Sequence, residues 1–407
     1  MTDFKLDSRW FDDGLQANLK KENIFLALEN ARHRGQIVMI FEKEEETMKM
    51  KKMQKKHLMG SIILFLLFCF VTAGYAADKP IIMKIGNPGP GHPHKHFIAA
   101  SSLEFKDYVE RHTKGGIKVE IYPANQLGNM RAIMDMTKLG TIQGATCYSA
   151  VATMFLPEIE LIYIPFVFSS PEVAWRVFDG WFGEKMEKLW IERTGLLPLY
   201  QADNGGSRAF GLREKQIRKP GDLKGLKIRT PQSESIRIFT ESLGAAPAMI
   251  DWTELYSSVQ TGVVDGFEVP TAVLMFKLYE VIKYASITGH TWDMTFLLIN
   301  KKWFENLPDD YKKVVVEAGR HAKTVNRGVS ELLAAEIVQL LKERKVDVYT
   351  ADESVREEFR KISQKPVEDF LRKKLGDQWV DDFYKAVKEA EADIKADTNR
   401  KIQMFVK

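Results

Sequence analysis

Short apolar runs alternate with stretches of helical periodicity from Lys79 onward. Runs of roughly four to eight residues that are rich in β-branched and aromatic side chains predict strands. Six runs fit this description: Ile81–Gly86, Ile117–Tyr122, Leu226–Thr230, Val264–Val269, Thr295–Asn300 and Val346–Thr350. Because helical patterns separate these runs, we predict an α/β fold.

Helical patterns fill much of the intervening sequence and all of the C-terminal part. A helix is predicted from about Lys95 to His112, closed by Gly115 and Gly116. Another starts at Leu307-Pro308-Asp309-Asp310 and continues through apolar positions three and four residues apart. From about Glu353 to Lys401 the chain is charged and helical throughout, which predicts long C-terminal helices.

The length and composition fit two globular domains. The chain has 407 residues, 45% of them hydrophobic and 28% charged, and one domain takes roughly 100–200 residues. No low-complexity linker divides the sequence. We therefore expect the chain to cross between the domains more than once and to form a cleft with a stiff hinge.

The net charge argues against nucleic acid as a partner. The chain carries 59 Lys/Arg and 55 Asp/Glu, of which residues 1–76 hold 12 and 10, which leaves 47 and 45. This remainder is nearly neutral, and no basic run follows Lys56. Nucleic-acid-binding proteins carry a concentrated basic surface instead.

Residues 48–76 have the organisation of a secretory signal peptide. Met48–Lys56 contains five lysines and no acid, Ile62–Val71 is apolar, and small residues dominate Thr72–Ala77. We expect cleavage after Ala76 or one residue later, and a periplasmic mature protein. An uncleaved membrane anchor is the alternative, because Leu58–Ala77 is a run of 20 uncharged residues.

Residues 1–47 do not fit this organisation, because a signal peptide begins near the start of a chain. We interpret them as a non-native or untranslated extension, with Met48, Met50 or Met53 as the true start. The prediction of the fold therefore begins at residue 77.

Signatures of catalysis are absent from the sequence. It contains no G-x-S-x-G, H-E-x-x-H, P-loop or G-x-G-x-x-G pattern, so we expect a protein that is not an enzyme and uses no cofactor or metal. His92, His94 and His96 form a weak metal motif, because Pro93 disfavours a compact site, and one of them is an alternative cleft residue. Cys147 is expected to be a small buried residue rather than a reactive thiol.

Two arginines stand at positions suited to gripping a carboxylate. Arg229 ends a predicted strand and precedes a break at Pro231, and Arg208 follows the stretch Asn204–Ser207. A planar guanidinium binds a carboxylate through two parallel hydrogen bonds. Taken alone, however, either arginine is more often a solvated surface charge.

Ordered motifs run through nearly all of the chain after residue 77. They are FKDYVE at 105–110, YPANQLG at 122–128, IPFVF at 164–168, DLKGLKIR at 222–229, WTELY at 252–256 and QTGVVDG at 260–266. Together, in this order and spacing, they resemble the solute-binding subunits of tripartite ATP-independent periplasmic (TRAP) transporters, the DctP-like family.

The resemblance implies a periplasmic-binding-protein-like fold, in which two α/β domains joined by crossing strands and a long helix close on a ligand. We place domain I at about 79–203 and 295–333, and domain II at about 204–294 and 334–407. The resemblance also implies that the protein captures a small organic carboxylate and delivers it to the small and large TRAP membrane subunits. We expect a monomer, with a dimer as the alternative.

The resemblance assigns roles to individual residues. Arg229 matches the family's signature arginine, which pairs with the ligand carboxylate, and Arg208 matches a second cleft arginine. Trp252 matches a cleft aromatic, Gln232 a polar contact after the signature arginine, and Tyr148 a cleft position in the first domain.

One position departs from the family pattern. After Asp265-Gly266 the family often has x-Glu-Asn-Pro, with the asparagine helping to hold the carboxylate, whereas this chain has Phe267-Glu268-Val269-Pro270. Val269 cannot donate a hydrogen bond, so we expect a different grip and a more apolar carboxylate. Glu268 has three open roles: it faces the ligand, a cation or only the core.

Two other functions stay open on the sequence alone. A sensor would present the carboxylate to a membrane receptor, and neighbouring genes for transporter subunits would argue against it. A secreted enzyme on a binding-protein scaffold would require an activated nucleophile, a metal cluster or an acid/base pair, and no convincing set is present.

Overall fold

The computed structural model describes residues 46–53, 55–56, 59, 79–91 and 96–405. The chain divides into two units, residues 1–78 and 79–407. In the first unit the described residues are helical, and Met48, Met50 and Met53 are exposed. The predicted extension up to residue 45 and the apolar run and cleavage zone of the signal peptide lie outside the described residues. Within the described part, no helix has both the length and the apolar character that crossing a membrane requires.

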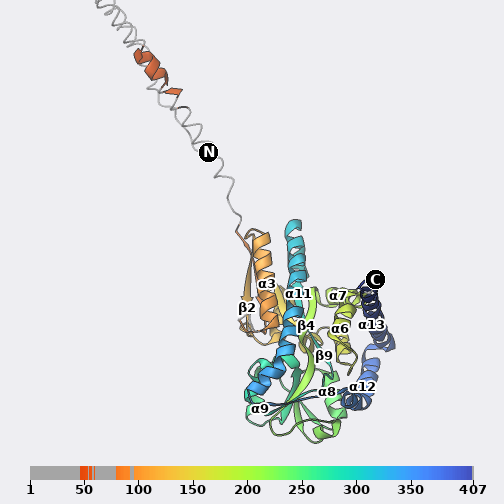
Figure 1. The fold of residues 1–407 in the computed structure, drawn as a ribbon. Helices are drawn as coiled ribbons and strands as arrows, with labels where there is room; N and C mark the ends of the chain where they lie inside the picture. Colours follow the sequence, from red (N-terminus) through yellow and green to blue (C-terminus); the bar gives the residue numbers. More distant parts are fainter. Residues whose placement is uncertain (1–45, 54, 57–58, 60–78, 92–95, 406–407) are drawn as a thin grey trace, which may run out of the picture. The chain divides into compact units, whose positions relative to one another are not determined.

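The second unit alternates strands with helices, as Figure 1 shows. Its strands are β1 (Ile81–Gly86), β2 (Ile117–Tyr122), β3 (Gly144–Tyr148), β4 (Leu196–Leu212), β5 (Lys227–Thr230), β6 (Ala246–Met249), β7 (Gly266–Pro270), β8 (Tyr284–Ile287), β9 (Trp292–Asn300) and β10 (Asp347–Thr350). Its α-helices are α3 (Phe97–His112), α4 (Met130–Leu139), α5 (Ser149–Ala152), α6 (Pro171–Asp179), α7 (Trp181–Thr194), α8 (Glu234–Ser242), α9 (Trp252–Gln260), α10 (Lys301–Glu305), α11 (Asp309–Glu343), α12 (Glu353–Leu375) and α13 (Asp377–Phe405). Short 3-10 helices are η3 (Pro157–Tyr163), η4 (Pro220–Leu223), η5 (Thr271–Met275) and η6 (Leu278–Glu280).

A single strand, β4, takes part in both sheets. In the first sheet the order is β2-β1-β3-β9-β4, with β1 parallel to β2 and β3 and with β9 antiparallel to both β3 and β4. In the second sheet β4 is antiparallel to β7 and β8, while β5 is parallel to β6 and β7. β4 pairs with β9 through Leu196–Ser207 and with β7 through Arg208–Leu212. The prediction of a two-domain α/β fold with crossing strands is confirmed.

A glycine pair marks the point where β4 leaves the first sheet. The pairing of β4 with β9 shifts between Asp203 and Ser207, and Gly205 and Gly206 have φ angles of 89° and 79°. A Cβ atom on Gly205 would lie 3.2 Å from the Cβ of Ala272 and 3.2 Å from Cε1 of Phe97. The left-handed backbone and the close neighbours both require glycine at this position.

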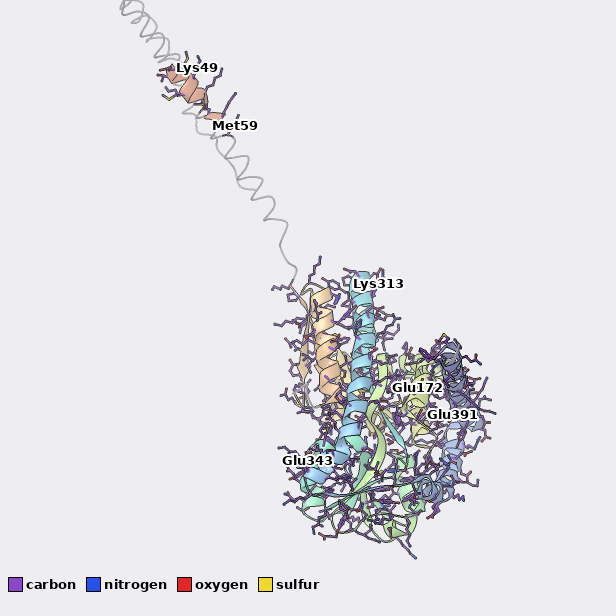
Figure 2. All side chains as sticks on the ribbon, in the orientation of Figure 1. Lys49, Met59, Glu172, Lys313, Glu343 and Glu391 are labelled. Carbon is purple, nitrogen blue, oxygen red and sulfur yellow. The ribbon has the colours of Figure 1, made fainter. Side chains whose placement is uncertain are left out.

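The long helix α11 contributes to two separate cores. Near its start, Val315 and Ala318 belong to the core that also holds Phe105 of α3, and α3 lies alongside α11 (Figure 1). Near its end, Ile337 and Leu341 belong to another core, built around β7 and η5. Figure 2 labels Lys313 and Glu343 towards the two ends of this helix of 35 residues. One helix therefore connects the packing of both domains.

The last two helices pack on different parts of the fold. α12 contacts α8, whereas α13 contacts α6 and α7, and Glu172 and Glu391 mark α6 and α13 in Figure 2. The rings of Phe182 and Phe383 lie 5.2 Å apart, and Lys185 pairs with Asp382 at 2.8 Å. The domain boundaries stay a prediction; they assign α13 to domain II and its neighbours α6 and α7 to domain I.

Candidate functional site

A cavity of about 60 Å³ opens at the carboxyl ends of strands from both sheets. It lies beyond the ends of β1, β3, β5 and β7, which is where α/β folds place their ligands. The side chains with polar groups in its described lining belong to His96, Tyr148, Asn204, Arg208, Arg229, Trp252 and Asp293. The structure therefore brings both predicted arginines to one cavity.

Arg229 is a buried cation without a counter-ion. It is the third of four residues in β5, and its side chain is only 3% exposed. Its Nε donates a hydrogen bond of 2.9 Å to the carbonyl oxygen of Ile250, and no described residue bonds to either Nη atom. Burial lowers the pKa of Arg229 to about 10, although the charge of Glu268 opposes this change. The guanidinium thus stays protonated at neutral pH and offers a complete fork to an anion.

Arg208 has a different environment, because its guanidinium is already hydrogen-bonded to two carboxylates. It donates to both carboxylate oxygens of Glu268, to the Glu268 carbonyl oxygen at 3.0 Å and to Oδ2 of Asp293. Burial alone would lower the pKa of Arg208, but the charges of these two carboxylates raise it. Arg208 therefore adds little free positive charge to the cavity.

Glu268 lies in the core beside Arg208 and does not line the cavity. Burial would raise its pKa, but the charge of Arg208 outweighs this effect and lowers it. Asp293 does line the cavity, and burial raises its pKa against the opposing charge of Arg208. The ring of His290 stacks against both Phe210 and Phe239, its Nε2 lies 3.6 Å from Glu268, and burial lowers the pKa of this imidazole.

Of the other predicted site residues, three line the cavity and one does not. Trp252 at the start of α9, Tyr148 at the end of β3 and Val269 in β7 all line the cavity. The hydroxyl of Tyr148 forms no hydrogen bond with a described residue, and burial raises its pKa above the ordinary value. Gln232 is exposed and does not line the cavity.

Sequence reasoning missed several lining residues. Asp293 sits inside β9, where nothing in its neighbours marks it, and Asn204 belongs to the stretch before Arg208, for which the sequence indicated no role of its own. Phe276 lies just beyond η5 and stacks on His96 with ring centroids 4.2 Å apart.

His96 is the one described member of the histidine triplet. Its Nδ1 accepts a hydrogen bond of 3.1 Å from the backbone N–H of Ile98, which caps α3. Burial lowers the pKa of His96 to about 3, so the ring is neutral at physiological pH. His92 and His94 lie outside the described residues, and the described part contains no group of three or more side chains suited to holding a metal ion.

The chemistry that this arrangement supports is anion binding. Cys147 is fully buried and is not among the lining residues, and burial raises the pKa of its thiol above the ordinary value. The hydroxyl of Ser149 is engaged by Asp293 and by the Tyr163 hydroxyl at 2.7 Å. Neither group is an activated nucleophile that faces the cavity.

Comparison with known proteins gives a consistent set of relatives. The model of the bacterial extracellular solute-binding protein family 7 (DctP) matches residues 90–374. The 2,3-diketo-L-gulonate-binding periplasmic protein YiaO of Escherichia coli (strain K12) is 28% identical over 317 residues, which cover 78% of this chain and 91% of that protein.

Solved structures resemble the chain over almost their whole length. The sugar acid binding protein of Advenella mimigardefordensis in complex with galactonate is 27% identical with a TM-score of 0.72, covering 77% of this chain and 99% of that one. A TRAP periplasmic solute-binding protein of Polaromonas sp. JS666 bound to D-erythronate is 28% identical with a TM-score of 0.70, covering 75% and 98%.

Proposed function

The chain belongs to the bacterial extracellular solute-binding protein family 7 (DctP), and from this membership we propose that it captures a small organic carboxylate through Arg229. Proteins of this family are periplasmic receptors that bind small organic acids and work with TRAP membrane components. We extend each of these properties to this chain: export by residues 48–76, binding without turnover, and delivery to the small and large membrane subunits.

The observation that carries the proposal is the buried, unpaired guanidinium of Arg229. A charged group removed from water without a partner is costly, and a carboxylate in the cavity would supply the missing acceptors. One charge-assisted hydrogen bond contributes about 1.5–3 kcal/mol. Two such bonds and some apolar burial support binding near about −8 kcal/mol, which corresponds to a roughly micromolar Kd.

The resemblance to structures with bound galactonate and D-erythronate supports the carboxylate class, since each of those ligands is an organic acid. The mechanism follows from the cavity being lined by both domains. The carboxylate first meets Arg229 while the cleft is open to water. Closure about β4 and α11 then excludes water, which strengthens the ion pair.

The experiment is a calorimetric titration of the purified protein with a panel of small organic acids and their neutral amides. We expect at least one acid to bind and its amide to bind at least tenfold more weakly. Arg229→Ala should lose at least tenfold in affinity, and Arg229→Lys should bind poorly as well, because an ammonium lacks the bidentate fork. Unchanged affinity in both variants, with unchanged unfolding midpoints, would disprove the assignment of Arg229.

A further inference from the structure

The described part of the cavity lining holds one unpaired positive charge. Arg208 is shared between Glu268 and Asp293, and His96 is neutral because it is buried. No lysine is among the described lining residues. A ligand with two carboxylates would therefore find no free cation for its second charge among the described lining residues, and placing the charge beside them carries a considerable desolvation cost.

Apolar side chains make up much of the rest of the described lining. Phe97 and Ile98 of α3 face the cavity from one domain, while Trp252, Val269, Val273 and Phe276 face it from the other. The free polar groups of the described lining are the Tyr148 hydroxyl, the Asn204 side chain, the Trp252 indole N–H and Nε2 of His96, for which no hydrogen bond with a described residue is present. Each ligand hydroxyl that faced the apolar side chains instead of these groups would be left without a partner, at about 1–3 kcal/mol.

The cavity is also small. A volume of about 60 Å³ has room for about four to six water molecules, at about 10–15 Å³ for each. This volume favours a compact body over a long chain. Apolar atoms in contact with these walls contribute about 25 cal/mol for each Å² removed from water.

We propose that the ligand is a monocarboxylate with a compact apolar body, either a branched aliphatic chain or a single aromatic ring. This inference rests on the proposed function. Arg229 and the Tyr148 hydroxyl hold the carboxylate, and the wall of Trp252, Val269, Val273 and Phe276 encloses the body. This class differs from galactonate and D-erythronate, the hydroxylated acids bound to the two related structures. Val269 contributes to the difference because it offers a methyl surface where an amide would offer hydrogen bonds.

The test is calorimetric titration of the purified protein with benzoate, 3-methylbutanoate, succinate, galactonate and benzamide. We expect benzoate or 3-methylbutanoate to bind at least tenfold tighter than succinate and galactonate, and benzamide to bind at least tenfold more weakly than benzoate. Val269→Thr keeps the shape of the side chain and adds a hydroxyl to the apolar wall, so it should weaken the preferred acid about fivefold or more. Val263→Thr, on an exposed side chain, is the matched control and should change nothing.

The outcomes separate this inference from the proposed function. Tighter binding of succinate or galactonate, abolished by Arg229→Ala, would overturn the apolar class and leave carboxylate capture intact. Binding of benzamide equal to that of benzoate and insensitive to Arg229→Ala would overturn the proposed function too, as would the absence of binding by every acid. Should Val269→Thr fail to fold, Val273→Thr on η5 tests the same wall, and an unchanged affinity would contradict the enclosure of an apolar body.

Discussion

Arg208 donates hydrogen bonds to both carboxylate oxygens and to the backbone carbonyl oxygen of Glu268. Arg208 is on β4 and Glu268 on β7, and both side chains are almost fully buried. The pair therefore connects two adjacent strands at the edge of the cavity. The family resemblance assigns two arginines to the ligand. Because Arg208 is already paired with Glu268, Arg229 is the arginine that is free to bind it.

Glu268→Gln should destabilise the protein strongly. Removing one partner of a buried ion pair leaves an uncompensated charge and costs about 3–5 kcal/mol, although Asp293 remains beside Arg208 and favours the lower end. Urea unfolding measures the loss. Glu305→Gln, which breaks the exposed pair with Lys301, is the matched control and should cost less than about 1 kcal/mol. Equal losses in the two variants would contradict a structural role for the pair.

Arg229→Met should separate stability from function. The unpaired cation disfavours the folded state without ligand, so its removal should keep or raise the free energy of unfolding, despite the loss of the bond to Ile250. The same variant should no longer be stabilised by the acid that stabilises the parent protein. Thermal unfolding with and without the acid measures both effects. A variant more than about 1 kcal/mol less stable than the parent would mean that Arg229 supports the fold itself.

Ligand affinity should fall at high pH because Arg229 must be charged. Its pKa is lowered to about 10, chiefly by burial, so the free protein keeps the cation below that pH and loses it above. Between pH 6 and 9 we expect a constant affinity, followed by a decline through about pH 10. Titration of the acid across this range, with circular dichroism to confirm that the protein is folded, measures the midpoint. A decline already complete at pH 8 would point to another group.

Asp203 should make stability depend on pH near neutrality. It is buried beneath Trp175, whose Nε1 donates to both carboxylate oxygens, and burial raises its pKa to about 7. The folded state holds this proton more tightly than the unfolded state, so the stability is present at low pH and is lost as pH rises from about 4 to about 7.

Asp203→Asn removes that dependence. The variant should gain stability relative to the parent as pH rises from 5 to 8, by on the order of 3 kcal/mol. Urea unfolding at several pH values measures the difference between the two proteins. Asp393→Asn on the exposed surface of α13 is the control and should track the parent at every pH. A gain that does not change with pH would contradict the burial of a charge at Asp203.

Gly205→Ala should cost more stability than Gly195→Ala. Both glycines have positive φ angles, at 89° and 71°, so both variants strain the backbone. Only at Gly205 does the new Cβ meet other atoms, Ala272 and Phe97, at 3.2 Å. We expect an additional loss of about 1–3 kcal/mol from this overpacking, measured by urea unfolding. Equal losses would show that β4 tolerates a side chain where it crosses between the sheets.

The local pattern of apolar and polar residues predicted those helices and strands whose buried positions are visible in their own sequence. β1 and β2 have the predicted bounds, and α11 begins at Asp309 within the predicted start signal. β4 was missed, because its 17 residues include Pro198, Gly205 and Gly206, which normally interrupt a strand. Its continuity comes from pairing with β9, β7 and β8, which no local pattern encodes.

The candidate site, too, could be predicted from the sequence only in part. Arg229 reaches the cavity near the end of β5 and Arg208 where β4 passes from one sheet to the other, and the resemblance identifies both. The sequence does not indicate that Arg208 is neutralised, because Glu268 and Asp293 are 60 and 85 residues away along the chain. Gln232 follows Arg229 closely, yet it is exposed because the chain turns at Pro231 before α8 begins.

The strand shared by both sheets limits how this molecule can be taken apart. A cut at Gly205-Gly206 would not release two autonomous fragments, since β9 returns to the first sheet and α11 then supplies side chains to both cores. To transfer one domain to another scaffold, several segments that are separate in the sequence would have to be transferred together. Recombination between distant relatives should for the same reason succeed only when those segments are exchanged together.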